Sequence, residues 1–255
     1  MGNYLLCRRP LAETPFYIES IHLNIYSLEE LCFFLSTNIA IADEVILDPS
    51  LSEWLEKECG MKNIREYNSI ASAKGKIGYR LYWIFVKSHY FSENELRKYK
   101  MRIEAFDATS EMERQKLKGD ALIKFGKYKR SIDCYEEVFH MQGISSMPSF
   151  FRASVYNNMG CAYAKLFQAA RATECFEKAF KTDGSEVFRD SYIRAIYFEG
   201  GFEKMQKEIK RLELDDNYLQ DMRREIAGIQ AKPVAEDKEK TLNEWIRQYH
   251  VSVDQ

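Results

Sequence analysis

The sequence predicts an all-α protein of stacked antiparallel helix pairs, preceded by a short irregular or strand-forming N-terminal segment. Three observations predict this class. Only 5 of the 255 residues are Pro and 12 are Gly, fewer than turn-rich β folds use. Ser or Thr is followed three residues later by Glu at several places, which is typical of helix starts. The middle of the chain also repeats its own pattern of small and apolar residues, as helical hairpins do.

Helix starts are marked by a hydroxyl that can accept from a first-turn amide and a carboxylate that can reach back to the cap. The pairs are Ser27 with Glu30, Ser50 with Glu53, Ser92 with Glu95, Ser110 with Glu113, and Thr241 with Glu244. With the apolar periodicity, they predict helices near 27–37, 50–59, 61–73, 77–91, 92–107, 110–125, 129–141, 152–166, 168–182, 186–199, 202–212, 216–229 and 239–249.

The N-terminal 26 residues have a different pattern. Ile21, Leu23 and Ile25 alternate with polar residues, which indicates strand rather than helix. We expect a small hairpin or an extended arm there. Three regions follow: a mostly helical region over 1–91, helical repeats over 92–230, and a linker with a C-terminal helix over 231–255.

An internal repeat is the most specific signal in the sequence. The aligned residues are Gly119, Leu122, Gly126, Tyr128, Ser131, Tyr135 and Val138 in the first copy, and Gly160, Tyr163, Phe167, Ala169, Ala172, Phe176 and Ala179 in the second. We name residues 112–145 repeat 1 and residues 153–186 repeat 2. A degenerate third copy over 186–219 lacks the small residue at the second helix crossing. The first two copies are 41 residues apart, which predicts a loop around 143–149.

This pattern resembles the tetratricopeptide repeat (TPR), a 34-residue helix-turn-helix unit. The residues of repeat 2 in the family's signature positions are Tyr156, Met159, Gly160, Tyr163, Ala172, Phe176 and Ala179. Repeat 1 departs from the signature at Gln115 and Lys118. The resemblance implies a right-handed superhelix with a concave binding groove, completed by the N-terminal helices. Residues 14–18 and 25–31 also look like uncharacterised bacterial TPR proteins, a looser likeness that implies no function.

Charge and composition exclude several classes of function. Lys and Arg total 37 against 39 Asp and Glu, so no positive field favours nucleic acid. The apolar runs are too short to span a bilayer. Six scattered cysteines form no C-x-x-C pair, which predicts buried thiols in a reducing cytoplasm. We expect no metal and no cofactor.

Catalytic motifs are also missing from the sequence. The four histidines lie far apart, and His89 and His140 are expected at helix ends. Cys32 with His22 could form a nucleophile pair, but Cys32 lies in an apolar run and is expected in the core. We therefore expect a non-enzymatic protein. The alternative is a small catalytic domain over residues 1–90, with the repeats as a targeting arm.

Candidate binding residues come from the exposed face of each first repeat helix. They are Lys116, Asn157, Asn158, Lys165, Arg194 and Phe198. Lys116, Asn157, Lys165 and Arg194 resemble residues with which some TPR proteins hold a peptide's terminal carboxylate, although their order does not reproduce that clamp. Ordinary solvated helix faces are the competing interpretation. The expected function is an adaptor for a peptide or protein partner, and the alternative is a dedicated chaperone or regulatory subunit of a secretion or signalling assembly. The partner's identity and the oligomeric state are left open.

Overall fold

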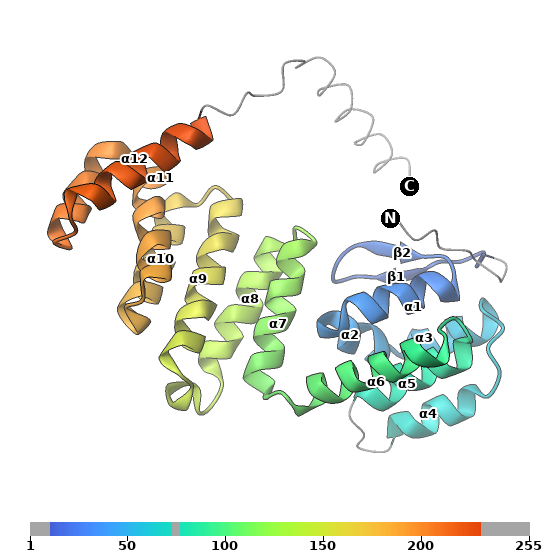
Figure 1. Ribbon diagram of the computed structural model, residues 1–255. Coiled ribbons are helices and arrows are strands. Elements are labelled where there is room, and N and C mark those ends of the chain that lie inside the picture. Colours follow the sequence, from blue (N-terminus) through green and yellow to red (C-terminus); the bar gives the residue numbers. More distant parts are fainter. Residues whose placement is uncertain (1–10, 73–76, 231–255) are drawn as a thin grey trace, which may run out of the picture. The chain divides into compact units, whose positions relative to one another are not determined.

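A computed structural model describes residues 11–72 and 77–230, and 77% of the structure is helical, which confirms the predicted class (Figure 1). The elements, in chain order, are β1 (Phe16–Ile18), β2 (Leu23–Ile25), α1 (Leu28–Thr37), η1 (Ile39–Ile41), α2 (Ala42–Leu47), α3 (Pro49–Lys57), α4 (Ile64–Ser72), α5 (Ile77–Ser88), α6 (Glu93–Ala108), α7 (Glu111–Lys124), α8 (Tyr128–His140), η2 (Ile144–Ser146), α9 (Ser149–Lys165), α10 (Ala169–Asp183), α11 (Glu186–Arg211) and α12 (Asp216–Gln230).

The chain divides into two compact units, residues 1–195 and 196–255. The first holds the N-terminal elements, both repeats and the beginning of α11. The second holds the rest of α11 and α12. The predicted helix at 239–249 and its start at Thr241 lie outside the described residues.

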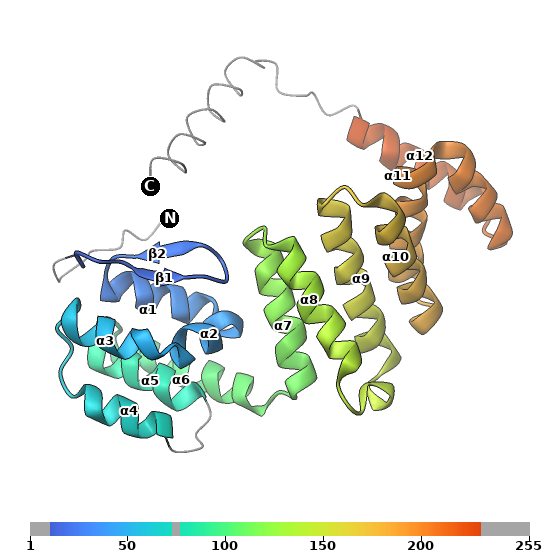
Figure 2. The same ribbon diagram turned by 180° about the vertical axis from the view of Figure 1, so that it is seen from behind.

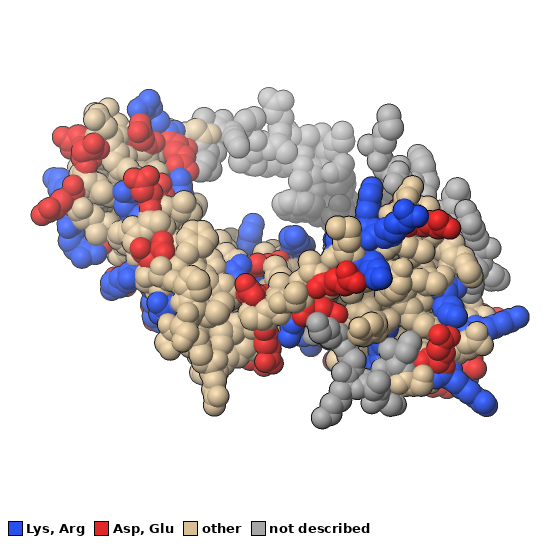
Figure 3. Space-filling model, turned by 60° about the horizontal axis from the view of Figure 1, so that its bottom comes forward, with Lys and Arg blue, Asp and Glu red and all other residues tan. Residues whose placement is uncertain are grey.

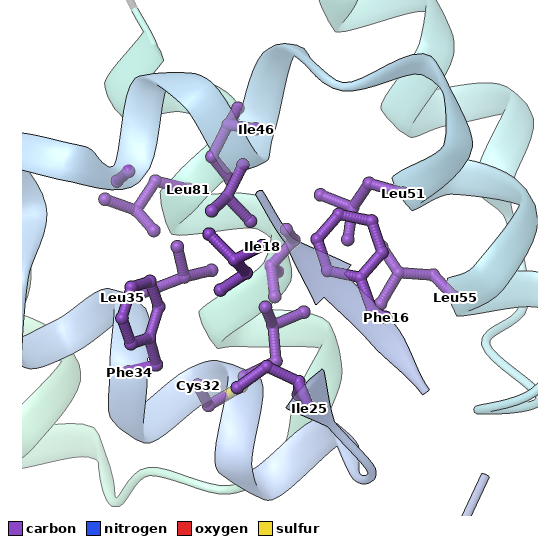
Figure 4. Close-up of a cluster of buried hydrophobic side chains, with 14 of the residues drawn as sticks. Phe16, Ile18, Ile25, Cys32, Phe34, Leu35, Ile46, Leu51, Leu55 and Leu81 are labelled. Atoms are coloured by element: carbon purple, nitrogen blue, oxygen red, sulfur yellow. The ribbon is translucent and has the colours of Figure 1, made fainter. Parts of the chain in front are cut away.

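The N-terminal segment forms the expected hairpin. β1 and β2 are antiparallel, with Phe16 opposite Ile25 and Ile18 opposite Leu23. Alternation places Phe16, Ile18 and Ile25 on the buried side, where each is at most 4% exposed. Figure 4 shows these side chains meeting Leu35, Leu51, Leu55 and Leu81 from the surrounding helices. The two short strands are thus stabilised by apolar burial against helices rather than by a larger sheet.

The helices around this hairpin form one core with the first repeat. α5 crosses it with Leu81, Ile84 and Phe85 almost fully buried, as its apolar run predicts. The core continues into Leu122 of α7 and Cys134 of α8. The helices η1 and α2 were not predicted, because this short stretch has no side-chain cap. Its helicity depends on burying Ile41, Val45 and Ile46.

Two of the predicted helix starts are complete capping boxes. Ser92 with Glu95 begins α6, and Ser110 with Glu113 begins α7. Ser27 caps α1, but the Glu30 carboxylate accepts from the Tyr26 amide instead of reaching back to Ser27.

The start predicted at Ser50 is wrong. Asp48 caps α3 by accepting from the amide of Ser50, and Pro49 takes the first helical position. Pro lacks an amide hydrogen, which that position does not need.

The two repeats are helical hairpins that lie side by side. α7 packs on α8, α8 on α9 and α9 on α10, and Figures 1 and 2 show this order from opposite sides. The predicted loop between the repeats is present and contains η2. The helices expected at 186–199 and 202–212 are both present within α11, which is broken between them at Gly201, where φ is 74° and ψ is −171°. One glycine in this conformation is enough to break the helix direction without a longer turn.

Candidate functional site

Each repeat brings its two helices together through a glycine on the first helix and an aromatic ring on the second. A Cβ atom at Gly119 would lie 2.6 Å from Tyr135 Cε1, and one at Gly160 would lie 3.0 Å from Phe176 Cε1. Ordinary side chains do not tolerate the first distance. The close approach inferred from the sequence is therefore present in both repeats and is tighter in repeat 1.

Because the Tyr135 ring of α8 lies against Gly119 of α7, its hydroxyl group comes within hydrogen-bond distance of the next residue of α7, Asp120. The Tyr135 ring is fully buried, and its hydroxyl donates to Asp120 Oδ1 at 2.6 Å. Burial, followed by this bond to Asp120, raises the pKa of the Tyr135 hydroxyl well above its usual range. The phenol therefore remains a proton donor at every physiological pH.

Asp120 is the centre of a polar network that joins α7, α8 and α9. Besides the Tyr135 hydroxyl, it accepts from Lys116 Nζ at 2.8 Å and from Asn158 Nδ2 at 2.7 Å. The side chains of Lys116 and Asp120 are 17% and 26% exposed, so the network lies at the edge of the interior. Low local dielectric strengthens such charge-assisted bonds. The network ties the first helices of the two repeats to each other.

The two neighbouring asparagines are in different positions within this network. A carboxylate has no proton to give, so the atom that Asn158 turns toward Asp120 must be its NH₂ group. Asn158 Oδ1 then accepts from Asn157 Nδ2 over a longer distance of 3.3 Å. Asn157 Oδ1 is buried and makes no hydrogen bond with any described residue. One acceptor at the end of the network therefore has no donor in the described part of the chain.

The predicted site residues are partly brought together. Lys116, Asn157 and Asn158 meet in the network, and Lys165 is exposed at the last residue of α9. Arg194 lies on α11 in the first unit and is half-buried. Phe198, 75% exposed, belongs to the second unit and is described separately from the others.

Asp120 and Tyr135 were not among the predicted site residues. Aligning the two repeats could have identified them. Repeat 2 has Cys161 where repeat 1 has Asp120, and Phe176 where repeat 1 has Tyr135. A carboxylate and a hydroxyl that appear together in one copy suggest a hydrogen bond between them. We name the exposed side of the first helices that carries Lys116, Asp120, Asn157, Asn158 and Lys165 the α7–α9 face.

The turns of the two hairpins also differ. Gly126 adopts φ 70° in repeat 1, and Phe167 adopts φ 58° at the aligned place in repeat 2. A bulky residue rarely takes this left-handed conformation. The Phe167 side chain is 95% exposed, so no packing within the described chain compensates for the strain.

The residues considered for catalysis do not assemble. Cys32 is fully buried in the N-terminal core, whereas His22 Nδ1 lies 2.6 Å from the hydroxyl of the exposed Tyr17. His140 ends α8, and His89 directly follows α5, as expected for helix-end histidines. Within 11–72 and 77–230, no group of His, Cys, Asp and Glu is placed to hold a metal ion.

Surface charge is mixed in sign. On the face shown in Figure 3, blue and red side chains alternate along the described surface without a broad region of one sign, in keeping with the net charge of -2. None of the described helices is both long and apolar enough to cross a membrane.

Two solved structures are similar to the chain. Both are crystal structures of nearly identical TPR-like repeats from Podosopora anserina, in a protein assigned as a kinesin light chain. The first, a point variant, is 15% identical, covers 78% of this chain and 95% of its own, and gives a TM-score of 0.37. The second is 16% identical, covers 81% and 96%, and gives 0.36. A likeness this weak carries no weight for fold or function.

Comparison at the level of sequence families is more direct. No curated protein matches the sequence. The family model described as "Tetratricopeptide repeat" matches residues 153–185, which is repeat 2 within one residue of its predicted bounds. That segment forms the α9–α10 hairpin with the glycine–aromatic contact described above. The chain therefore contains a tetratricopeptide repeat at residues 153–185.

Proposed function

We propose that this chain is a non-enzymatic, cytoplasmic adaptor that binds a peptide segment of a protein partner on its α7–α9 face. TPR repeats generally mediate protein interactions. The observation that carries the proposal is the end of the Asp120 network, where Asn157 Oδ1 is buried without a donor among the described residues. An orphaned buried acceptor costs roughly 1 to 3 kcal/mol, and a bound partner could supply the missing hydrogen bond once the Asn157 side chain rotates toward the surface.

Two exposed cations extend the same face. Lys124 and Lys165 end α7 and α9, and neither forms an ion pair within the part of the chain that the structure describes. A face with hydrogen-bonding amide groups and flanking cations suits an extended peptide. We assign three polar residues to peptide binding: Asn157 and Lys165 on α9, and Arg194 on α11.

The experiment uses random peptides displayed on phage and selected against the full chain. Replacing Asn157, Lys165 and Arg194 together by Ala should reduce binding of the selected peptides by about tenfold or more, the equivalent of one hydrogen bond to a charged group. Thermal melting checks that the variant is folded. Selected peptides that bind this folded variant like the parent chain would show that the α7–α9 face is not the binding site.

A second candidate is a chaperone that holds an apolar segment, and the exposed Phe198 favours it. This function predicts the opposite sensitivity. Phe198→Ser should abolish binding of apolar peptides, while the triple Ala variant should bind them normally. Both variants are measured against the same selected peptides, so one experiment separates the two functions.

A further inference from the structure

The turns of the two hairpins carry only positive charge. Six cations lie in or beside them: Lys124, Lys127, Lys129, Arg130, Lys165 and Arg171. The surrounding stretches, residues 124–131 and 164–173, contain no Asp or Glu. Lys127 is half-buried, and the other five cations are exposed. We name these six residues, together with Leu166 and Phe167, the turn surface.

Both turns lie at the same end of the paired hairpins. Figures 1 and 2 show the α7–α8 and α9–α10 turns at one end of the repeats, since α7 and α9 run in the same direction. The bond from Asn158 to Asp120 sets the register of these two helices. Lys124 follows Asp120 by four residues, about 6 Å along the axis, and Lys165 follows Asn158 by seven, about 10 Å. One flat surface can therefore contact both turns at once.

The basic charge recurs at aligned places in the two repeats. Lys124 and Arg130 of repeat 1 align with Lys165 and Arg171 of repeat 2. These residues are exposed, so neither position takes part in the glycine–aromatic packing that holds each hairpin together. The shared architecture of the repeats therefore does not require the basic pair, which needs another explanation.

Stability of the fold does not explain these cations either. Lys129 and Arg130 lie in the first turn of α8, and Arg171 lies in the first turn of α10. Neither first turn has an acidic residue or a side-chain cap, and the positive end of a helix dipole disfavours cations there. None of the six cations forms an ion pair within the described part of the chain that would offset this cost. Residues that oppose local stability are typical of functional surfaces.

An apolar projection accompanies the cations of the second turn. Phe167 is 95% exposed and Leu166 is 36% exposed, and they directly follow Lys165 in the chain. The aligned residue in repeat 1 is Gly126, so the turn itself does not need an aromatic side chain. An exposed aromatic ring flanked by cations suits the boundary between lipid headgroups and acyl chains.

We propose that the turn surface binds an anionic lipid membrane from one side. Its cations contact the phosphate groups of the lipid headgroups, while Leu166 and Phe167 enter the apolar layer beneath them. Two features favour a membrane over nucleic acid as the anionic partner. Leu166 is aliphatic and cannot stack on bases, and the net charge of -2 supplies no further positive surface for a phosphate backbone to follow.

Vesicle flotation tests this inference on the full chain. One set of vesicles contains phosphatidylcholine alone, and the other contains equal parts of phosphatidylcholine and phosphatidylserine. The chain should float with the anionic vesicles and not with the neutral ones. Added sodium chloride should weaken this binding, because salt screens the attraction between exposed charges.

A double substitution tests the cations. Lys129→Ala combined with Arg130→Ala should weaken binding to the anionic vesicles about 25-fold, a factor of about five for each cation. It should not lower the melting temperature, because both cations leave a helix start that disfavours them. Lys62→Ala combined with Lys98→Ala is the matched control. It removes two exposed lysines outside the turns and should bind like the parent chain.

Two substitutions at one position test the apolar projection. Phe167→Ser should weaken binding about tenfold and leave its dependence on salt unchanged, because salt does not screen an apolar contact. Phe167→Trp places an indole at the same point. Its fluorescence should shift to shorter wavelength when anionic vesicles are added, as the ring leaves water for the headgroup boundary.

Several results would overturn the inference. They are absence of binding to the anionic vesicles, equal loss of binding in the double variant and its control, and an unshifted emission from the Phe167→Trp protein. Single-stranded RNA of random sequence is the competing ligand. If the chain binds this RNA more tightly than the anionic vesicles, and the Lys129 and Arg130 double variant loses that binding, the turn surface is a nucleic-acid site instead.

Discussion

Repeats 1 and 2 have the same architecture but differ in chemistry at two places. Both place a glycine of the first helix against an aromatic ring of the second. Repeat 1 adds a hydroxyl to that ring and a carboxylate next to that glycine, and the two meet in the Asp120 network. Repeat 2 has Phe176 and Cys161 at these places, which cannot form the same bond. The comparison teaches that the signature residues determine packing, whereas the residues beside them determine which polar groups the outer side of the first helices carries.

The largest expected effect removes the centre of the network. Asp120→Ala leaves Tyr135, Asn158 and Lys116 without their common acceptor, and should lower the free energy of unfolding by about 2 to 3 kcal/mol, because Tyr135 is buried. Cys161→Ala, at the aligned place in repeat 2, should change it by no more than about 0.5 kcal/mol. Urea unfolding of both variants measures the contrast, and equal losses would show that the network does not stabilise repeat 1.

Substituting the contact glycine should also destabilise repeat 1 more than repeat 2. Gly119→Ala forces a Cβ against the buried Tyr135 ring and should cost about 1 to 3 kcal/mol through overpacking. Gly160→Ala requires Phe176 to move by only a few tenths of an ångström and should be close to neutral. Gly160→Leu, with a larger side chain, should cost about 1 to 3 kcal/mol.

Gly228→Ala is the control for helix propensity, because its Cβ would meet nothing within 4 Å. It should raise stability by up to about 1 kcal/mol. Melting temperatures compare the variants, and a stabilised Gly119→Ala protein would contradict the tight crossing in repeat 1.

Substitutions at the turns of the two hairpins should change stability in opposite directions. Gly126→Ala places a side chain in the left-handed region and should lower stability by about 1 kcal/mol. Phe167→Gly relieves that strain in repeat 2 and should raise stability by a smaller amount, since glycine also gains entropy in the unfolded chain. A lower melting temperature for Phe167→Gly would mean that the exposed ring makes a stabilising contact.

The smallest expected effect depends on pH. In repeat 1, hydrogen bonds from the backbone and side chain of Ser110 lower the pKa of Glu113 from its ordinary value of 4.5. Since the folded pKa is the lower one, this carboxylate stabilises the fold above pH 4.5, and the contribution disappears as the pH falls through the folded value.

Glu113→Gln should therefore melt below the parent chain at neutral pH, and the difference should shrink in acid, below the ordinary glutamate pKa. The first helix of repeat 2 has no side-chain cap, so its start offers no comparable pH dependence. A melting difference that stayed constant from neutral pH into this acidic range would exclude the ionised carboxylate as its cause.

Much of this protein is determined locally by its sequence. The capping boxes at Ser92 and Ser110, the alternation from Ile21 to Ile25 and the glycine–aromatic spacing each depend on residues close together in the chain. They correctly predicted α6, α7, the hairpin and the repeats. Helix α2 was missed because its helicity comes from burying Val45 and Ile46 in the core, which no local pattern records.

The candidate site likewise has features that the sequence predicted and features that only the packing of the helices decided. Helical periodicity predicted that Lys116, Asn157 and Lys165 lie on the outward sides of their helices; Lys165 is exposed, whereas Lys116 and Asn157 are half-buried. It did not show that Lys116 pairs with Asp120, that Asn158 donates to Asp120 while Asn157 Oδ1 has no donor among the described residues, or that the Tyr135 hydroxyl from another helix completes the network. These properties depend on distances between atoms up to 38 residues apart in the chain. The sequence by itself determined which residues share one side of a helix, because that follows from the periodicity of a single helix, whereas only the packing of three helices decided which of their hydrogen-bonding groups are paired with one another.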